Sequence, residues 1–71
     1  MANFRIMQDG VDTGYSVVNS PSADSAIKMA QKTLSGKITA EKIKEELEVP
    51  RMFQNCLVDK ATLRGFRNKF V

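Results

Sequence analysis

Three side chains that could address nucleic-acid bases lie within five residues of one another: Arg51, Gln54 and Asn55. On a helix, at about 100° per residue, they would share an arc of roughly 100°. In the major groove of DNA, arginine can pair with guanine, and glutamine and asparagine can pair with adenine. We therefore predict a base-contacting surface on a short helix over residues 50–57. The alternative is that these side chains form only the solvated side of that helix.

A second group of candidate residues is basic and lies near the C-terminus: Lys60, Arg64, Arg67 and Lys69. Residues 51–71 hold five Lys or Arg and one Asp, whereas residues 1–50 hold six Lys or Arg and seven Asp or Glu. This asymmetry indicates an anionic partner. On a helix, Lys60, Arg64 and Arg67 fall within about 60°, so together they could bind a phosphate backbone. Their long stems could equally cover apolar surface while the charges stay in water.

The segment over residues 38–57, ITAEKIKEELEVPRMFQNCL, contains the predicted base-contacting helix. A preceding helix is expected from Thr39 to about Glu48, because Thr39 suits an N-cap and Ile38 and Ile43 have the spacing of a hydrophobic staple. Pro50 interrupts it, since proline lacks an N–H and disfavours helical geometry in the residue before it. Two helices separated by a break resemble a helix-turn-helix. The resemblance implies that the second helix reads the major groove of DNA.

The composition argues against catalysis and metal binding. The chain has one cysteine, Cys56, and no histidine. An intramolecular disulfide and a zinc site within one chain are therefore excluded, and a cysteine nucleophile would have no imidazole beside it. We expect a protein that is not an enzyme and requires no cofactor.

The N-terminal segment has the pattern of a β-hairpin. Asp9 and Gly10 form a preferred pair for a two-residue turn in which both residues have positive φ. With this turn as the loop, Phe4 faces Tyr15, Ile6 faces Thr13 and Ala2 faces Val17, all on one apolar side. Such a hairpin needs a partner on its apolar face. The expected partner is a helix that begins at residues 20–22 and stops near Gly36, with apolar residues at helical spacing.

The remaining elements complete an α+β fold. Asp59 is expected to cap a last helix that carries Leu63, Phe66 and Phe70 on one face. The predicted order is ββαααα: a β-hairpin packed on a helix over residues 1–36, then a trihelical, helix-turn-helix-like half over residues 37–71. Hydrophobic residues make up 42% and charged residues 27% of the chain, which is typical of a folded protein. We expect residues 1–71 to form a single domain.

Two functions are consistent with these patterns and stand as hypotheses. The first is a small nucleic-acid-binding regulator, with DNA favoured over RNA because no RNA-module motif is present. The second is a protein-interaction module, an inhibitor or adaptor of a larger partner that uses the hairpin edge, where Asn3, Arg5 and Met7 form a polar side. Homodimerisation would add stability and suit a DNA ligand with two half-sites. No apolar run approaches the roughly 20 residues of a membrane span, so we expect a cytoplasmic protein without membrane contact.

Overall fold

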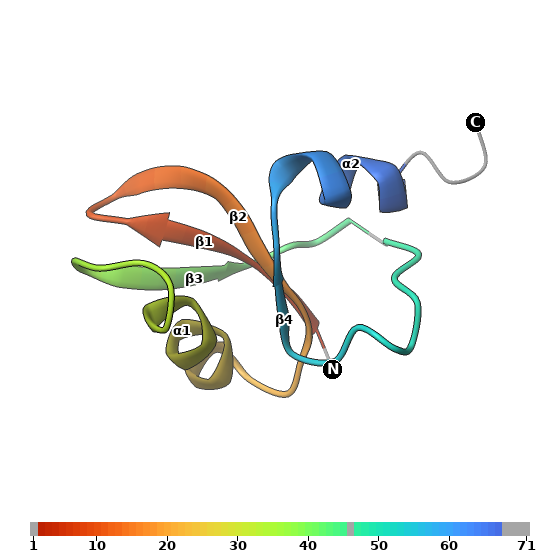
Figure 1. The fold of residues 1–71 in the computed structure, drawn as a ribbon, viewed down its shortest axis with the longest axis horizontal. Coiled ribbons are helices and arrows are strands. Elements are labelled where there is room, and N and C mark those ends of the chain that lie inside the picture. Colours follow the sequence, from red (N-terminus) through yellow and green to blue (C-terminus); the bar gives the residue numbers. More distant parts are fainter. Residues whose placement is uncertain (1, 46, 68–71) are drawn as a thin grey trace.

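The computed structural model of the chain describes residues 2–45 and 47–67. Within them the elements are β1 (Ala2–Gln8), β2 (Val11–Ser20), α1 (Ala23–Gln31), β3 (Ile38–Lys42), β4 (Cys56–Val58) and α2 (Lys60–Arg67). The strands form one antiparallel sheet in the order β3-β1-β2-β4 (Figure 1). The predicted ββαααα order is therefore wrong, because the two middle helices are absent: residues 38–42 form β3, and residues 47–55 form an irregular loop that leads into β4.

The predicted hairpin is confirmed, and its turn is the expected one. Asp9 and Gly10 have φ angles of 51° and 81°. These positive values match the twist of the two flanking strands. Next to the turn, Gln8 pairs with Val11 and Met7 pairs with Asp12, as the simple two-residue loop requires.

Further from the turn the predicted register is wrong, because β2 contains extra residues that β1 does not match. The register shifts between Arg5 and Met7 and again between Ala2 and Phe4, so Phe4 faces Val17 and not Tyr15. Gly14 lies in the first irregularity with a φ of 82°, and its N–H donates to the Asp12 carboxylate at 2.9 Å. Bulges of this kind favour glycine in the left-handed region. As a result Ser16 lies opposite Arg5.

The predicted helix after the hairpin is also confirmed, although it is shorter than expected and ends at Gln31. Ser22 is its N-cap, and the Ser22 hydroxyl accepts a hydrogen bond of 3.2 Å from the N–H of Ser25. Ala26 and Ala30 are fully buried against the sheet, where they join a core that contains Phe4, Ile6, Val17 and Ile38. Burying such apolar surface contributes roughly 25 cal/mol per Å².

Residues 38–42 form β3, so the predicted helix from Thr39 to Glu48 is wrong. The hairpin turn holds the start of this strand: Asp9 donates its N–H to the carbonyl of Lys37 at 2.9 Å, and the Asp9 carboxylate accepts from the N–H of Lys37 at 3.0 Å. The strand then pairs with β1, and Ile38 is buried in the core. Pairing along β1 satisfies backbone groups that would otherwise be unpaired at a sheet edge, and it outweighs the helix propensity of the segment.

The predicted helix over residues 50–57 is wrong as well, and with both helices absent no helix-turn-helix forms in the described part of the chain. Residues 43–45 and 47–55 run as an irregular loop that leads into β4. The side chain of Asn19 holds this loop by donating to the carbonyl of Phe53 at 2.6 Å, and the N–H of Asn55 donates to the carbonyl of Asn19 at 3.1 Å. Cys56 then pairs with Val18 at the far edge of the sheet.

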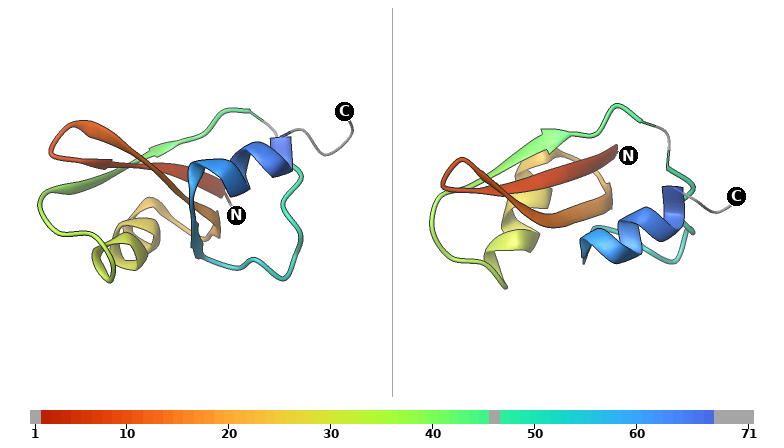
Figure 2. Two further views of the ribbon diagram at one scale, coloured as in Figure 1. Left: turned by 45° about the horizontal axis from the view of Figure 1, so that its top comes forward. Right: turned by 90° about the horizontal axis from the view of Figure 1, so that it is seen from above.

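The predicted last helix is confirmed as α2, with Asp59 as its cap. The Asp59 carboxylate accepts from the N–H of Thr62 at 2.8 Å. The helix leaves the end of β4 and lies away from α1, as both views in Figure 2 show. Val17 packs into the core beside α1, whereas its neighbour Ser16 borders a cleft against α2. Because side chains alternate between the faces of a strand, α2 lies against the face of β2 opposite to α1.

Candidate phosphate-binding cleft

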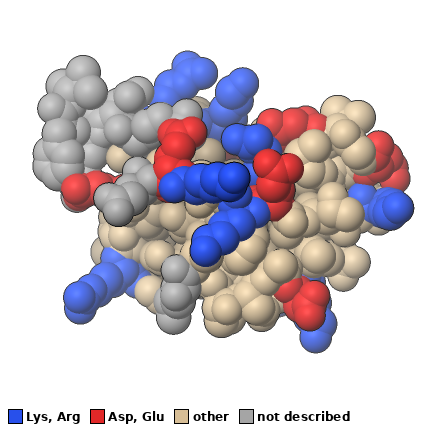
Figure 3. Space-filling model, turned by 180° about the vertical axis from the view of Figure 1, so that it is seen from behind, with Lys and Arg blue, Asp and Glu red and all other residues tan. Residues whose placement is uncertain are grey.

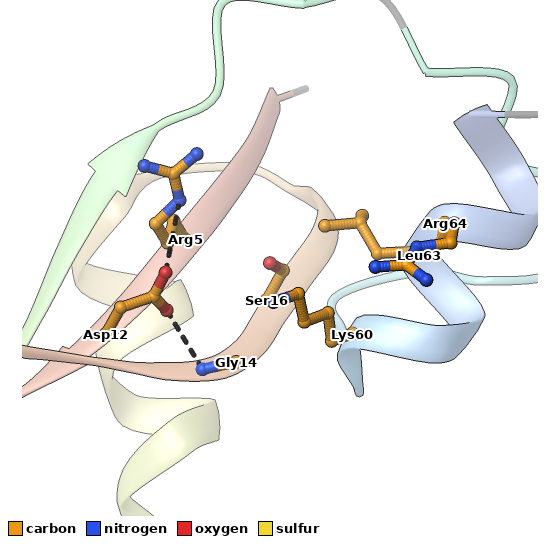
Figure 4. A pocket seen from close by; sticks show the side chains of 7 residues that line it. All are labelled: Arg5, Asp12, Gly14, Ser16, Lys60, Leu63 and Arg64. Atoms are coloured by element: carbon orange, nitrogen blue, oxygen red, sulfur yellow. Dashed lines mark hydrogen bonds and ion pairs between the residues drawn. The ribbon is translucent and has the colours of Figure 1, made fainter.

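A cleft of about 120 Å³ lies between α2 and the outer face of the sheet, the face that α1 does not cover. Its walls come from segments far apart in the sequence, as Figure 4 shows. The lining residues are Arg5 from β1, Asp12, Gly14 and Ser16 from β2, and Lys60, Leu63 and Arg64 from α2. We call this hollow the phosphate cleft, for the phosphate groups that its basic residues could bind.

The basic side chains of α2 are brought to the phosphate cleft by helical spacing. Lys60 and Arg64 are four residues apart, so they lie on the same side of the helix, one turn from each other. The helix is anchored at its start by Asp59. Near its end, the ring of Phe66 packs edge-on against Phe53 with 5.4 Å between the ring centroids. Phe66 is therefore a packing residue, as its alignment with Leu63 predicts.

The phosphate cleft has an excess of positive charge. Arg5 lies 4.0 Å from the Asp12 carboxylate and 4.0 Å from the Glu41 carboxylate. Both ion pairs are long and largely exposed, so each contributes little to stability. Among the described residues no carboxylate lies within ion-pair distance of Lys60 or Arg64. Three cations and one carboxylate leave the lining with a net charge of +2.

The charge on another face of the molecule is arranged differently. Figure 3 shows the molecule from behind the view of Figure 1. In the right-hand view of Figure 2, which is seen from above, this is the upper side, where β3 lies. There the Lys and Arg side chains near the middle of the face are flanked by acidic ones. Neighbouring charges of opposite sign cancel within a few ångströms, and salt screens what is left over longer distances. The lining of the phosphate cleft therefore has a less balanced charge than that mixed surface.

Asp59 is the acidic residue nearest in sequence to Lys60, and its carboxylate caps the start of α2. The hydrogen bond from the backbone N–H of Thr62, with a second from the Thr62 side chain, lowers the pKa of Asp59 below its ordinary value of 3.8. A carboxylate at this position also interacts favourably with the start of the helix. Asp59 thus stabilises α2 in its ionised form.

The predicted base-contacting residues do not share a helical face. Arg51 is exposed in a turn of the irregular loop. The Gln54 side chain donates to the carbonyl of Arg51 at 2.6 Å. The side-chain oxygen of Asn55 is buried without a hydrogen-bond partner among the described residues, and the backbone of Asn55 has a φ of 51°. The geometry expected for reading adenine is therefore missing at Gln54 and Asn55.

The predicted phosphate-contacting residues are brought together in part. Lys60 and Arg64 meet at the phosphate cleft as their spacing indicates. Arg67 is the last residue of α2, and Lys69 lies outside the described residues. Sequence reasoning missed Arg5 and Ser16, because the bulge at Gly14 sets which residue of β2 faces Arg5. The signal available was Asp12 followed two residues later by glycine, which is typical of a local side-chain-to-backbone turn.

Membrane-spanning helices and metal clusters are both missing from the described residues. Neither α1 nor α2, of nine and eight residues, is long and apolar enough to cross a membrane. Within residues 2–45 and 47–67, no cluster of three or more His, Cys, Asp or Glu side chains could hold a metal ion. Comparison with protein-family models, with curated proteins and with solved structures finds no match for this chain.

Proposed function

We propose that this protein is a non-enzymatic nucleic-acid-binding regulator that contacts the phosphate backbone through the phosphate cleft. The observation that supports the proposal is the convergence of Arg5, Lys60 and Arg64 on one cleft, with Lys60 and Arg64 free of acidic partners in the described part of the chain. Phosphate contacts by Lys and Arg provide most of the affinity in sequence-independent nucleic-acid binding. They also set the position of the protein on its ligand.

The composition of α2 favours the same interpretation. Its eight residues, KATLRGFR, include three cations and no carboxylate. The cleft itself is smaller than the roughly 300 Å³ of a pocket that encloses a whole small molecule, so a ligand would extend beyond it. A nucleic acid, which carries a phosphate at every nucleotide, fits both the basic helix and the small cleft.

The proposal covers nucleic acid in general. The preference for DNA over RNA rests on the lack of an RNA-module motif and on the resemblance to a helix-turn-helix, and the second argument is lost because the described fold contains no helix-turn-helix. Arg51 stays a candidate contact, because it is exposed. A regulatory role belongs to this proposal, since a binding domain of this kind would act by occupying its nucleic-acid ligand. A cytoplasmic location is proposed with it.

Fluorescence anisotropy with labelled DNA and RNA duplexes tests the proposal. Reversing both cations of α2, Lys60→Glu with Arg64→Glu, should weaken binding by tenfold or more, roughly 0.7 kcal/mol or more per charge. The matched control is Lys28→Glu with Lys32→Glu, which makes the same charge change at the same spacing on the exposed side of α1. An equal loss in both variants, or no binding by the wild type, would contradict a specific role for the phosphate cleft.

A second candidate function is protein interaction through the outer edge of β3. The edge of the hairpin expected to serve this role is covered, because β3 pairs along β1. The N–H of Ile43 donates to the carbonyl of Asn3, and the N–H of Asp9 donates to the carbonyl of Lys37. These two hydrogen bonds show which residues of β3 direct their backbone groups toward β1. In an antiparallel pair, alternate residues direct their backbone groups to the partner strand. The backbone groups of Ile38, Ala40 and Lys42 therefore point outward, where another strand could pair with them.

The two candidates are separated by a variant at this edge. Ala40→Pro removes an outward N–H and keeps the hydrogen bonds to β1, because proline is tolerated on the open side of an edge strand. If β3 is the functional surface, Ala40→Pro abolishes partner capture while the reversal of Lys60 and Arg64 leaves it unchanged. The opposite pattern, measured by affinity capture before and after nuclease treatment, supports nucleic-acid binding.

A further inference from the structure

We infer that the outer edge of β3 pairs antiparallel with the same edge of a second copy of this chain, in a register that places Lys37 opposite Glu41 of the second copy. The inference names one occupant for an edge that another strand could join. It does not depend on nucleic-acid binding, because β3 lies at the edge of the sheet opposite to β4, which leads into α2 (Figure 2).

The strand β3 is the longer of the two edge strands of the sheet. It has five residues, whereas β4 at the other edge has three. The pairing of β3 with β1 runs without a register shift, and the sequence of β3, ITAEK, holds no proline. Bulges and prolines keep many edge strands from pairing with other chains. Because β3 has neither, its outer edge can accept a strand along its whole length.

The backbone of β3 limits the registers that such a pair can adopt. The backbone groups of Ile38, Ala40 and Lys42 point outward, since those of the residues between them are directed toward β1. In an antiparallel pair these outward residues must face one another. A symmetric pair that overlaps by more than one residue of β3 therefore has its twofold axis beside Thr39, Ala40 or Glu41.

Two of these three registers bring unsuitable side chains together. With the axis beside Glu41, the two Glu41 carboxylates lie directly opposite each other, and like charges at such positions are destabilising. With the axis beside Ala40 the overlap is longest, but the buried Ile38 then faces the charged Lys42. That register also places no two opposite charges directly across from each other.

The register with its axis beside Thr39 pairs side chains that suit each other. Ile38 faces Ala40 on the side of the core, and Thr39 faces its own copy on the outer face. Lys37 faces Glu41 twice, once on each side of the axis. These charged residues occupy non-hydrogen-bonded positions, where opposite side chains approach most closely. The side chain of Glu41 is 69% exposed, so it can reach a lysine across the interface.

The pairing has a consequence for the phosphate cleft. The two four-stranded sheets join into one, and the twofold axis of an antiparallel pair is perpendicular to the sheet. Both α2 helices and both clefts therefore lie on the same face. The β2 strands of the two copies are separated by five strand spacings of about 4.8 Å, or about 24 Å. An extended nucleic acid that contacts both clefts would gain affinity by avidity, and this consequence alone rests on the proposed function.

Sedimentation equilibrium tests the inference at protein concentrations up to about 1 mM, because an interface of this size is weak. The wild type should show a monomer–dimer equilibrium. Lys37→Glu and Glu41→Lys should each weaken the dimer about tenfold, because each turns two opposite-charge pairs into like-charge pairs. The combination of Lys37→Glu with Glu41→Lys should restore it. Lys28→Glu, the same charge change on the exposed side of α1, should leave the equilibrium unchanged.

A backbone variant completes the test, and thermal unfolding checks that each variant is folded. Ala40→Pro should abolish the dimer, because it removes an outward N–H while proline is tolerated on the open side of an edge strand. A wild type that stays monomeric overturns the inference and leaves the phosphate-cleft proposal standing. A dimer that persists in Ala40→Pro forms on another surface and also overturns it. A dimer that is lost in Ala40→Pro but does not respond to the charge changes overturns the register of Lys37 opposite Glu41.

Discussion

The side-chain amide of Asn19 donates a hydrogen bond of 2.6 Å to the backbone carbonyl of Phe53, which lies 34 residues later in the chain. Asn19 has a φ of 52°, which asparagine tolerates better than most residues. The ring of Phe53 in turn packs against Phe66 of α2. One asparagine in a strand irregularity therefore connects the sheet to the loop that precedes β4 and, through Phe53, to the helix that lines the phosphate cleft.

The first prediction concerns Asn19. Asn19→Ala should lower the free energy of unfolding by about 2 kcal/mol, because it removes the bond to Phe53 and places alanine, which tolerates positive φ less well than asparagine, in the left-handed region. Asn19→Gly should cost less, since glycine retains the positive φ. Urea denaturation followed by circular dichroism measures both values. An Ala variant as stable as the wild type would show that this hydrogen bond does not hold the loop.

The second prediction contrasts two glycines. Gly36 has a φ of 90°, and a Cβ there would lie 2.9 Å from the Asp9 carboxylate, whereas a Cβ at Gly65 in α2 meets nothing within 4 Å. Gly36→Ala should destabilise the protein by more than about 1 kcal/mol, roughly the cost of a left-handed alanine, because the close approach to Asp9 adds to it. Gly65→Ala should stabilise it by roughly 0.5–1 kcal/mol, as expected in a helix interior. Thermal melts of the two variants should therefore move in opposite directions.

The third prediction is a pH dependence from Asp59. Hydrogen bonds from Thr62 lower the pKa of Asp59 below 3.8, so the folded protein favours its ionised form. The resulting stabilisation is present above pH 3.8 and is lost as the pH falls through the lower folded value. Asp59→Asn should remove this part of the acid sensitivity while it retains a capping side chain. If wild type and variant lose α2 helicity at the same pH, Asp59 is not the responsible group.

The parts of the fold that could be predicted from the sequence carry their signals locally. Asp9-Gly10 encodes its own turn, and Ser22 and Asp59 cap the helices that directly follow them. The strand β3 could not be predicted in this way, because its partner β1 is distant in the sequence. Its segment is rich in Glu and Lys, which favour a helix. The alternation of Ile38 and Ala40 was the one visible sign of a strand.

The residues of the candidate site likewise separate into those with a local sequence signal and those without one. Lys60 and Arg64 could be predicted because a helix places residues four apart on one side. Arg5 and Ser16 could not, because their pairing depends on the irregularity around Gly14, and the regular register expected from the hairpin pairs Ser16 elsewhere. The base-contacting group failed because its geometry required a helix, whereas residues 47–55 form an irregular loop that leads into β4.

The most direct test of the central claim is the salt dependence of binding to duplex DNA, with Lys60→Ala and Arg64→Ala combined. Each phosphate contact contributes about 0.9 to the slope of log affinity against log salt concentration. If both side chains bind phosphates, the slope should fall by nearly 2 relative to the wild type, whereas Lys28→Ala with Lys32→Ala should leave it unchanged. An unchanged slope in the Lys60 and Arg64 variant would contradict phosphate binding by the cleft.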